Sequence, residues 1–472
     1  MGAVPAGSRK FFRLSPAERE ALGGFAVRRG EVIERLDAHF HSPEHSRLLQ
    51  RLEASFPAIQ SLSSYADVTC GPFGSAIKNE DYRSSGIPLL RISDIGDDGT
   101  INTDQVVFIE EELSSKYQSS QVYPGDIVLS QRGTIGLPAV VPNTFPVWHI
   151  SANLIAIKRP SAPLLYVRDY LSSTFAQAHF ARRNSGQIQS KITTADVSAL
   201  PFPRVTDEET LSTRLELARR TRDASLAAAD MTLDGLDAFI LGKLGVNLPP
   251  VHDDAPFAIN RSSLRKGGKI VPNYYNPDRR HAVEELQRVG ADLLGNQVDF
   301  IREQRIISPD DKNYVGLANI RSNTGEFIDV EEEVGGIVSV FEQGDVLFAK
   351  LRPYLNKVWV ADRAGVCSPE FHVLRLSPGG QIQSSDYLAA ILRASPTLMQ
   401  TVRMMTGNTH PRLAPEDVVE LVIPVPAPAA QTTIASEVDR RRTEAYRLRA
   451  EARAQWAAAR QAFEDALLGP AI

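Results

Sequence analysis

Short apolar runs separated by turn residues characterise the chain before position 160, and such runs are typical of strands. The runs are 87–92, 106–109, 127–129, 139–141 and 154–157, with Gly-Asp, Asp-Asp-Gly and Pro-Asn between them. Residues 166–184 and 385–405 have their apolar positions at helical spacing instead. The pattern therefore predicts sheets on which a helix packs.

Two longer stretches carry apolar residues spaced by seven, which is the seam of a coiled coil. The first has Leu226, Leu233 and Ile240 beside Leu215, Ala229 and Leu236; the second has Val438, Ala445, Ala452, Ala459 and Ala466 beside Leu448, Trp456 and Phe463. A capping box, Thr206-Asp-Glu-Glu209, predicts the start of a first helix that continues to Gly245, and the second extends from about Gln431 to Gly469. Such seams often join two chains, but matched seams within one chain favour antiparallel pairing of its own two helices.

The chain also contains an internal repeat. Gly125-Asp126 returns as Gly344-Asp345, 219 positions later (344 − 125). Similar offsets relate Asp169-Tyr170-Leu171 to Asp386-Tyr387-Leu388, Gly186 to Gly407, Leu200-Pro-Phe-Pro203 to Leu421-Val-Ile-Pro424, and Phe40-His-Ser-Pro43 to Tyr275-Asn-Pro277. A period this long indicates a duplicated domain rather than a solenoid repeat.

The expected fold class is α+β: two repeated mixed α/β domains separated by a long antiparallel helix pair, in a pseudo-twofold arrangement. The expected divisions are a helical extension at 1–34 with a capping box at Ser15-Pro16-Ala17-Glu18, a first domain at 35–205, a first long helix at 206–246, a linker at 247–260, a second domain at 261–426 and a second long helix at 427–472. A helix of about 38 residues spans roughly 57 Å. The pair would therefore hold the two domains at a fixed distance.

Composition and charge narrow the class of protein. With 43% hydrophobic and 23% charged residues the chain is ordinary globular material, and no window approaches the run of about 18 apolar residues that a membrane helix needs. The N-terminus lacks the apolar stretch of a signal peptide. Cys70 and Cys367 have no metal-ligand spacing and fit the reducing cytoplasm as small buried residues. Because the net charge is −5 and neither domain has an excess of Lys and Arg, any affinity for DNA must come from local clusters of cations.

The sequence offers no motif for enzyme chemistry. The Asn/Asp-Pro-Pro-Tyr/Phe motif of amino-methyltransferases does not occur, and Gly242-Lys-Leu and Gly268-Lys-Ile lack the hydroxyl residue of a phosphate-binding loop. Asp278, Asp310, Asp311 and Lys312 match the metal site of nucleases only at a spacing that chance easily produces. The sequence therefore predicts a non-catalytic protein with no cofactor or metal.

Polar side chains gather where a buried strand ends in each copy. The first loop offers Ser130, Gln131, Arg132 and Thr134, and its counterpart offers Lys350, Arg352, Tyr354, Asn356 and Lys357. Arginine, amide and hydroxyl groups can bind base edges, and cations can bind phosphates. A constant frame with different tips is what two different half-sites would require. The alternative for each loop is a solvated hairpin tip with no binding role.

Further polar clusters are candidates for the same surface. Gln187, Gln189 and Lys191 follow Gly186, while Asn408, His410 and Arg412 follow Gly407, and each glycine allows close approach of the backbone. Ser75 and Lys78 lie near a Gly-Pro turn and form a weaker candidate. Plain connecting loops are the alternative. The arginines of the long helices are expected to be solvated: Arg214, Arg219, Arg220, Arg222, Arg440 to Arg442, Arg447 and Arg449.

Together these features resemble the specificity subunit of Type I restriction–modification systems. The resemblance rests on Gly86–Asp94, Pro124–Gly133, Ser185–Ile192 and the junction at 201–209, and on their counterparts Tyr314–Ile320, Gln343–Arg352, Thr406–His410 and Pro424–Gln431. It covers roughly residues 35–470. The ordered set, present twice with a long helix after each copy, is more specific than any single motif.

The resemblance implies that each copy is a target-recognition domain for a few base pairs of double-stranded DNA. It implies that the helix pair sets the spacer between half-sites and docks two adenine-N6 methyltransferase subunits, while a translocase–nuclease subunit completes the complex in the cytoplasm. About 30 residues before the repeat depart from the family's pattern. Two alternatives stay open: a two-lobed protein-interaction scaffold, and a DNA reader that serves a different phage-defence complex.

Overall fold

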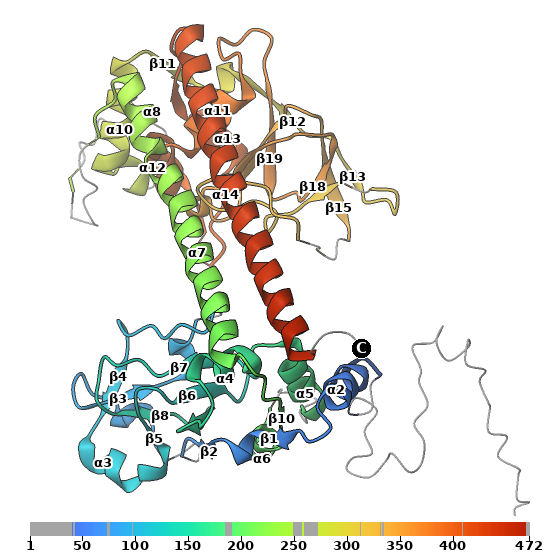
Figure 1. Cartoon of the computed structure of the whole chain (residues 1–472). Coiled ribbons are helices and arrows are strands. Elements are labelled where there is room, and N and C mark those ends of the chain that lie inside the picture. Colours follow the sequence, from blue (N-terminus) through green and yellow to red (C-terminus); the bar gives the residue numbers. More distant parts are fainter. Residues whose placement is uncertain are drawn as a thin grey trace, which may run out of the picture. The chain divides into compact units, whose positions relative to one another are not determined.

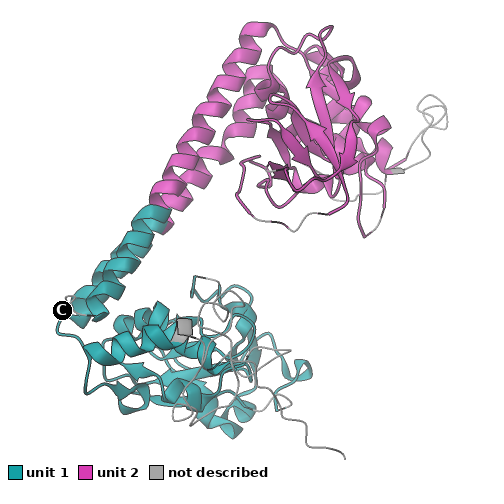
Figure 2. Cartoon of the chain, turned by 90° about the vertical axis from the view of Figure 1, so that its right-hand side faces the viewer, with its two compact units in different colours: residues 1–222, 453–472 teal, residues 223–452 magenta. Residues whose placement is uncertain are grey.

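The computed structural model describes residues 40, 43–72, 76–96, 98–184, 191–248, 257–258, 272–311, 313–330, 332, 335–407 and 409–468. The chain forms two compact units (Figure 2). Unit 1 comprises residues 1–222 and 453–472, and unit 2 comprises residues 223–452. Each unit therefore contains one repeat and a part of each long helix. The helix predicted at Ser15-Pro16-Ala17-Glu18 lies outside the described residues.

Unit 1 contains two four-stranded sheets and a short strand pair (Figure 1). Its strands are β1 (Gln60–Ser61), β2 (Asp67–Cys70), β3 (Ile87–Leu90), β4 (Val107–Ile109), β5 (Gln121–Val122), β6 (Ile127–Ser130), β7 (Pro138–Val140), β8 (Trp148–Ile150), β9 (Leu154–Lys158) and β10 (Pro201–Phe202). One sheet has the antiparallel order β2-β9-β6-β7, and the other has the order β4-β3-β8-β5 with β3 and β8 parallel. Its helices are α2 (Pro43–Ser55), α3 (Glu111–Lys116), α4 (Leu164–Leu171), α5 (Thr174–Arg183), α6 (Thr194–Ser198) and the first part of α7 (Glu208–Asp234). All five predicted strands are confirmed.

Unit 2 repeats this architecture. Its strands are β11 (Ala291–Leu293), β12 (Val298–Ile301), β13 (Gln304–Ile306), β14 (Tyr314–Val315), β15 (Ile337–Phe341), β16 (Val346–Ala349), β17 (Val358–Val360), β18 (Gly365–Cys367), β19 (Phe371–Leu376) and β20 (Val422–Pro424). The sheets have the orders β12-β19-β16-β17 and β13-β15-β18-β14, with β14 and β18 parallel. Its helices are α8 (Leu236–Leu244), α10 (Pro277–Arg288), α11 (Ser385–Arg393), α12 (Ser395–Met404), α13 (Pro415–Val419) and most of α14 (Pro428–Leu468).

Each unit is a three-layer stack of helices, sheet and sheet. In unit 1, Ile127 and Leu129 of β6 pack with helix residues such as Tyr166, whereas Val128 packs with Trp148 of the second sheet. Alternate residues of a strand point to opposite faces, so β6 is buried on both sides and its first three residues are all apolar. The middle strand β16 of unit 2 divides in the same way between two cores.

The duplication extends to single hydrogen bonds. In the Gly-Asp turn of each copy the aspartate accepts a hydrogen bond from the backbone N–H three residues earlier, at 2.9 Å for Asp126 and 2.8 Å for Asp345. The preceding glycines have φ values of 93° for Gly125 and 90° for Gly344, which a side chain would strain. The turn that first revealed the repeat is therefore a structural element in both units.

The proline-containing segments at β10 and β20 are held by equivalent hydrogen bonds in the two units. The hydroxyl of Tyr166 donates to the carbonyl of Pro203, and that of Tyr387 donates to the carbonyl of Pro424, both at 2.9 Å. The two pairs lie 221 positions apart (387 − 166 and 424 − 203). These matched bonds show that the sequence repeat is a repeat of structure.

The two copies differ in the second sheet. Three strands correspond, β3-β8-β5 in unit 1 and β14-β18-β15 in unit 2. The fourth strand lies on opposite edges: β4 pairs with β3, but β13 pairs with β15. The units thus share their inner layers and differ at the margins of the outer sheet.

Three predictions were wrong in detail: the two helices that pack on the sheets and the burial of Cys70. Each predicted helix at 166–184 and 385–405 is two helices, because Ser173 caps α5 and a proline, Pro396, lies in the first turn of α12. The first long helix is confirmed from Glu208 to Leu244, and a short break divides it into α7 and α8. Gly235 separates these helices, as expected from its low helix propensity. Cys70 is exposed because it ends an edge strand, although Cys367 is buried as predicted.

Each long helix helps to complete the core of both units. In unit 1, Phe463 and Leu467 near the end of α14 pack with Leu215 of α7. In unit 2, Ile240 of α8 packs with Val438 of α14. The described helix segments therefore pair within each unit, and the residue numbers rise along one helix as they fall along the other, so they run antiparallel.

Acidic side chains fasten these helix ends to the repeats. Glu464 of α14 accepts hydrogen bonds from the N–H and the hydroxyl of Thr174 in unit 1, at 3.0 and 2.9 Å. Asp237 of α8 accepts one from the N–H of Ser395 in unit 2, at 2.8 Å. Each carboxylate thus caps the N-terminus of α5 or α12, where the helix has unpaired N–H groups.

Candidate nucleic-acid interface

The β6–β7 loop (131–137) of unit 1 is held by the segment that precedes α6. The N–H of Gln131 donates to the carbonyl of Asn153 at 2.9 Å, and the carbonyl of Gln131 accepts from Ile192 at 3.2 Å. Arg132 and Lys191 form an antiparallel bridge beside these bonds. The structure therefore brings together two polar clusters that are about 60 residues apart in the sequence.

The β16–β17 loop (350–357) of unit 2 has the same frame. Lys350 donates its N–H to Glu370 at 2.7 Å and accepts from Leu413 at 3.0 Å. Leu351 and Arg412 form the bridge. The loop and the segment before α13 are thus joined in unit 2 as they are in unit 1.

The exposed tips of these loops differ. Arg132 and Thr134 are exposed in the β6–β7 loop, and Arg352 and Tyr354 are exposed in the β16–β17 loop. Neither guanidinium has a hydrogen-bond or ion-pair partner among the residues that the structure describes. Within the described residues, each loop therefore presents at its tip an arginine without a hydrogen-bond or ion-pair partner. The neighbouring exposed side chain carries a hydroxyl group in unit 1 and an aromatic ring in unit 2.

Two of the candidate residues in unit 1 shape the loop instead. Ser130 is 1% exposed, its hydroxyl accepts from the N–H of Leu137 at 2.9 Å, and it donates to the carbonyl of Thr134. Gln131 is 8% exposed. These two hydrogen bonds of the Ser130 hydroxyl cross the loop and hold Thr134 at the surface. The serine therefore positions the tip of the loop.

Three candidates in unit 2 are likewise engaged in the loop's support. The Lys350 ammonium donates to the carbonyl of Pro369, and that of Lys357 donates to Leu317, both at 2.7 Å. Burial lowers the pKa of both ammonium groups. Asn356 is buried and donates to the carbonyl of Arg393 at 2.9 Å. These side chains anchor the loop on which Arg352 and Tyr354 stand.

Of the other predicted site residues, some are exposed or half-buried, and the rest are not among the residues that the structure describes. Ser75, Gln187, Gln189 and Asn408 lie outside the described residues. Lys78 and His410 are exposed, and Lys191 is half-buried. Arg412 is bound in a two-pronged ion pair to Glu370, at 2.8 and 3.0 Å, and this pairing raises its pKa. Gly407 has φ 98°, a backbone conformation that favours glycine. Its role in a close approach of the backbone stays a prediction.

Sequence reasoning missed a cavity that adjoins the β6–β7 loop. It has a volume of about 240 Å³ and is lined by Asp98, Thr134, Arg219, Arg222, Trp456 and Arg460 among others. The arginines come from α7 and α14, which were expected to present solvated faces. Only the antiparallel pairing of the helices brings these positions beside the loop, so no local sequence signal could have identified it.

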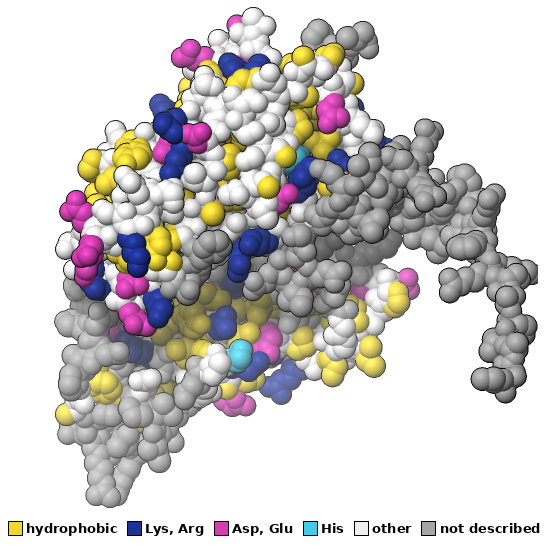
Figure 3. Space-filling model, turned by 90° about the horizontal axis from the view of Figure 1, so that it is seen from below, with side chains coloured by type: hydrophobic (Ala, Val, Ile, Leu, Met, Phe, Trp, Pro, Cys, Tyr) yellow, Lys and Arg dark blue, Asp and Glu magenta, His cyan; other side chains and the backbone are white. Residues whose placement is uncertain are grey.

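Basic side chains of the described residues are scattered on the face drawn in Figure 3, where lysine and arginine are interspersed with acidic and uncharged side chains. This distribution agrees with the net charge of −5. Binding of an anionic polymer at this protein would therefore depend on local groups such as the loop arginines.

The described residues contain no cluster of three or more His, Cys, Asp or Glu side chains that could hold a metal ion. Of the loose nuclease-like set, Asp311 is paired with Arg305 at 2.6 Å, and Lys312 lies outside the description. Within the part of the chain that the structure describes, no helix is both long and apolar enough to cross a bilayer.

Comparison with known sequences gives limited information. No family model matches the chain. A curated protein, the cyclic di-GMP phosphodiesterase response regulator RpfG of Xanthomonas campestris pv. campestris, is 30% identical over 169 residues. That similarity covers 34% of this chain and spans 42% of the regulator's length.

Comparison with solved structures finds Type I restriction–modification proteins. The specificity subunit from M. genitalium is similar over 88% of this chain and 96% of its own, with 12% identity and a TM-score of 0.46. A structure from a study of assembly of the type I system covers 87% and 96%, with 16% identity and a TM-score of 0.47. The specificity subunit HsdS from Thermoanaerobacter tengcongensis covers 87% and 95%, with 15% identity and a TM-score of 0.34.

Proposed function

We propose that this chain is the non-catalytic DNA-recognition subunit of a Type I restriction–modification complex. Unit 1 and unit 2 would each bind one half of a split target in double-stranded DNA. One observation carries the proposal: two matched loop frames present different tips, Arg132 with Thr134 and Arg352 with Tyr354. An arginine fork binds guanine through two hydrogen bonds, and a changed neighbour changes the preferred base.

The anchored loop frame supports base recognition rather than a solvated tip. Specific recognition requires donors held in place before the DNA arrives, since each ordered side chain otherwise costs entropy on binding. Ser130 in unit 1 is buried and hydrogen-bonded within its loop, and Asn356 in unit 2 is buried and hydrogen-bonded to the carbonyl of Arg393 at the end of α11. These bonds hold the loops from which the exposed side chains project.

The proposed partners follow from the motif resemblance. The long helices would set the unread spacer and dock two adenine-N6 methyltransferase subunits, and a translocase–nuclease subunit would join them. In this scheme the chain supplies sequence recognition, and its partners supply the chemistry. The expected location of such a complex is the cytoplasm, where its DNA is found.

Modification-sensitive sequencing of host DNA, with and without this gene and with its neighbours present, tests the function. A split N6-methyladenine motif that disappears on deletion would support a two-part DNA reader and identify both half-sites. An unchanged methylome, with an expressed methyltransferase, would contradict the proposal and favour an interaction scaffold or a reader that serves other machinery.

A further inference from the structure

A corner in unit 2 joins the two sheets. β12 pairs with β19 in the first sheet, and β13, which follows after two residues, pairs with β15 in the second sheet. Arg302 and Glu303 form this corner. The carbonyl of Glu303 accepts a hydrogen bond from the N–H of Val340 at 3.0 Å, so the backbone of the corner is held against β15.

The corner lies at the same sheet edge as the β16–β17 loop. β12 and β16 both run antiparallel to β19, one on each side of it. They therefore point in the same direction, and both end beside the first residues of β19, Phe371–Val373. Arg302 directly follows β12, and Lys350 directly follows β16. The corner is thus a neighbour of the loop that presents Arg352 and Tyr354.

A cavity of about 340 Å³ adjoins both the corner and the loop. Its polar lining comes from four segments: Arg302 of the corner, Gln304 of β13, Lys350 of the loop and Glu416 at the start of α13. The lining therefore offers hydrogen-bond donors and acceptors together. Base edges also present both donors and acceptors, so a mixed lining suits them.

Arg302 and Gln304 both have groups available to a ligand. Arg302 is exposed, and its guanidinium has no hydrogen-bond, ion-pair or aromatic partner among the residues that the structure describes. Gln304 is also exposed, and its amide nitrogen donates to the hydroxyl of Ser339 at 3.3 Å. That bond orients the Gln304 side chain and leaves its amide oxygen without a partner within the described residues.

The acids near the corner do not occupy these two groups. Glu303 lies between them in the chain but is not among the residues that line the cavity. Glu370, beside the loop, is bound by Arg412 at 2.8 and 3.0 Å. Glu416 lines the cavity, but the structure shows no ion pair of 4.0 Å or less between it and Arg302 among the described residues. Glu416 is therefore an additional acceptor.

The corner is a feature of one copy of the repeat. In unit 2, β13 pairs with the edge of the second sheet at β15. Among the described strands of unit 1, the corresponding strand β5 is itself the edge, and the fourth strand β4 pairs with β3 instead. The shared fold therefore does not require the corner, which leaves its side chains available for a function of unit 2 alone.

We propose that Arg302 and Gln304 contact base edges in the half-site bound by unit 2, beside the base pairs contacted by Arg352 and Tyr354. The inference rests on the proposed DNA-recognition function and adds a second contact region to one unit. Lys350, which lines the cavity, precedes Arg352 by two positions. Their Cα atoms are therefore at most about 7 Å apart, or about two base-pair steps of roughly 3.4 Å. A guanidinium suits guanine, and a side-chain amide suits adenine.

Competition binding by the full chain, followed by fluorescence anisotropy, tests this inference. A labelled duplex carries the split motif found by modification-sensitive sequencing, and each competitor duplex differs from it at one base pair. The half-site of unit 2 is the one that Arg352→Ala/Tyr354→Ala relaxes. In that half-site Arg302→Ala/Gln304→Ala should lower discrimination by roughly 5- to 140-fold at base pairs other than those that the tip variant relaxes.

Matched variants keep the outcome interpretable. Arg305→Ala removes another exposed arginine of β13, paired with Asp311 at 2.6 Å, and should leave discrimination unchanged at every base pair. Arg302→Lys keeps the charge but not the planar fork, so it should lose discrimination and retain affinity for a scrambled duplex. If the double variant does not fold, Arg302→Ala alone, at its exposed position, should still relax a base pair of this half-site.

The outcomes separate this inference from the proposed function. A wild-type chain that does not prefer the motif duplex would contradict DNA reading, and the inference with it. A wild-type chain that prefers it, with unchanged discrimination in the Arg302→Ala and double variants, would overturn the corner contacts alone. An equal loss of affinity for every duplex would overturn them in favour of a phosphate contact, which carries no sequence information. Relaxation of the other half-site would also contradict them.

Discussion

The β6–β7 loop of unit 1 and the β16–β17 loop of unit 2 stand on matching frames but differ in every exposed side chain except the arginine. In unit 1 the tip pairs Arg132 with Thr134, and in unit 2 it pairs Arg352 with Tyr354. The supports differ as well: a serine hydroxyl closes the first loop, whereas two half-buried lysines anchor the second. Recognition can therefore change at the tip while the backbone bonds beneath it persist.

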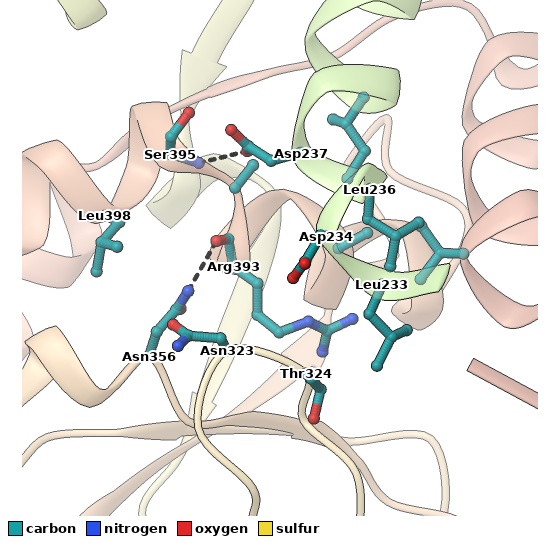
Figure 4. Close-up of a pocket in the computed structure, with 14 residues that line it drawn as sticks. Leu233, Asp234, Leu236, Asp237, Asn323, Thr324, Asn356, Arg393, Ser395 and Leu398 are labelled. Atoms are coloured by element: carbon teal, nitrogen blue, oxygen red, sulfur yellow. Dashed lines mark hydrogen bonds between the residues drawn. The ribbon is translucent and has the colours of Figure 1, made fainter. Parts of the chain in front are cut away.

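The cavities beside the long helices extend this comparison from shape to charge. The chain as a whole is acidic, yet α7 and α14 contribute arginines to the cavity beside the β6–β7 loop, whereas α7 and α8 contribute Asp234 and Asp237 to a cavity of unit 2 that Arg393 also lines (Figure 4). Net charge therefore says little about where an anion can bind. Local placement, which depends on how the helices pair, decides it.

Truncation of a buried side chain near the end of a long helix should have the largest effect on stability. It tests whether each long helix contributes to the cores of both units. Phe463→Ala should destabilise unit 1 by about 3–5 kcal/mol, although Phe463 follows the second repeat in sequence, because its ring is buried against Tyr166. Ile240→Ala should destabilise unit 2 by about 2–5 kcal/mol. Hydrogen exchange with mass spectrometry would locate each loss. Loss of protection in the opposite unit would contradict the arrangement.

A buried ion pair in unit 2 should give the next largest effect. Arg449 of α14 is 7% exposed and binds Glu326, and also Asp230 at 2.6 Å. Arg449→Met leaves Glu326 without this partner and should cost about 3 kcal/mol in the free energy of urea unfolding, while Arg449→Met/Glu326→Leu should cost less. Arg447→Met, at an exposed position, should cost below about 1 kcal/mol. Equal losses for Arg449→Met and Arg447→Met would refute the buried role.

Acid should weaken both units through one buried histidine in each, which lies on α5 in unit 1 and on β19 in unit 2. His179 in unit 1 and His372 in unit 2 are buried and hydrogen-bonded to backbone carbonyls, and burial lowers the pKa of each from 6.5 to about 4. Their unfolded forms therefore take up protons first, so stability is complete above pH 6.5 and is lost as the pH falls towards 4.

Replacing each of these histidines with glutamine removes its proton uptake. Between about pH 7 and about pH 5, each histidine should account for about 2 kcal/mol of lost unfolding free energy. His179→Gln and His372→Gln keep a side-chain N–H donor but do not titrate, so each should reduce the pH dependence in its own unit. Urea unfolding at the two pH values measures this, and an unaltered pH dependence in the double variant would contradict it.

Much of the fold could be predicted because its signals are local. The Gly-Asp turns, the apolar strands and the seven-residue seams all lie within short windows, and the repeat made each of them visible twice. The break at Gly235 and the pairs α4–α5 and α11–α12 were missed because helical periodicity continues across a short cap. Periodicity finds the buried face of a helix but not its ends.

The candidate site could be predicted only in part. The sequence located the loops, and the structure joins them to the segments before α6 and α13, but the sequence could not separate supporting from exposed side chains. Ser130 and Thr134 both carry a hydroxyl group. Only the hydrogen bonds that Ser130 makes across the loop distinguish them, because these bonds bury Ser130 and leave Thr134 exposed. The cavity beside the β6–β7 loop depends on the proximity of residues more than 200 positions apart, such as Arg222 and Trp456.

The most direct measurement is modification-sensitive sequencing of DNA from strains carrying wild type, Arg132→Ala/Thr134→Ala or Arg352→Ala/Tyr354→Ala, each with the neighbouring methyltransferase gene. Removing a side chain that binds a base edge costs about 1–3 kcal/mol of discrimination. The first variant should therefore relax one half of the split methylation motif and leave the other intact, and the second should do the reverse. Relaxation of both halves by either variant, or of neither half by both, would contradict two independent readers in one chain.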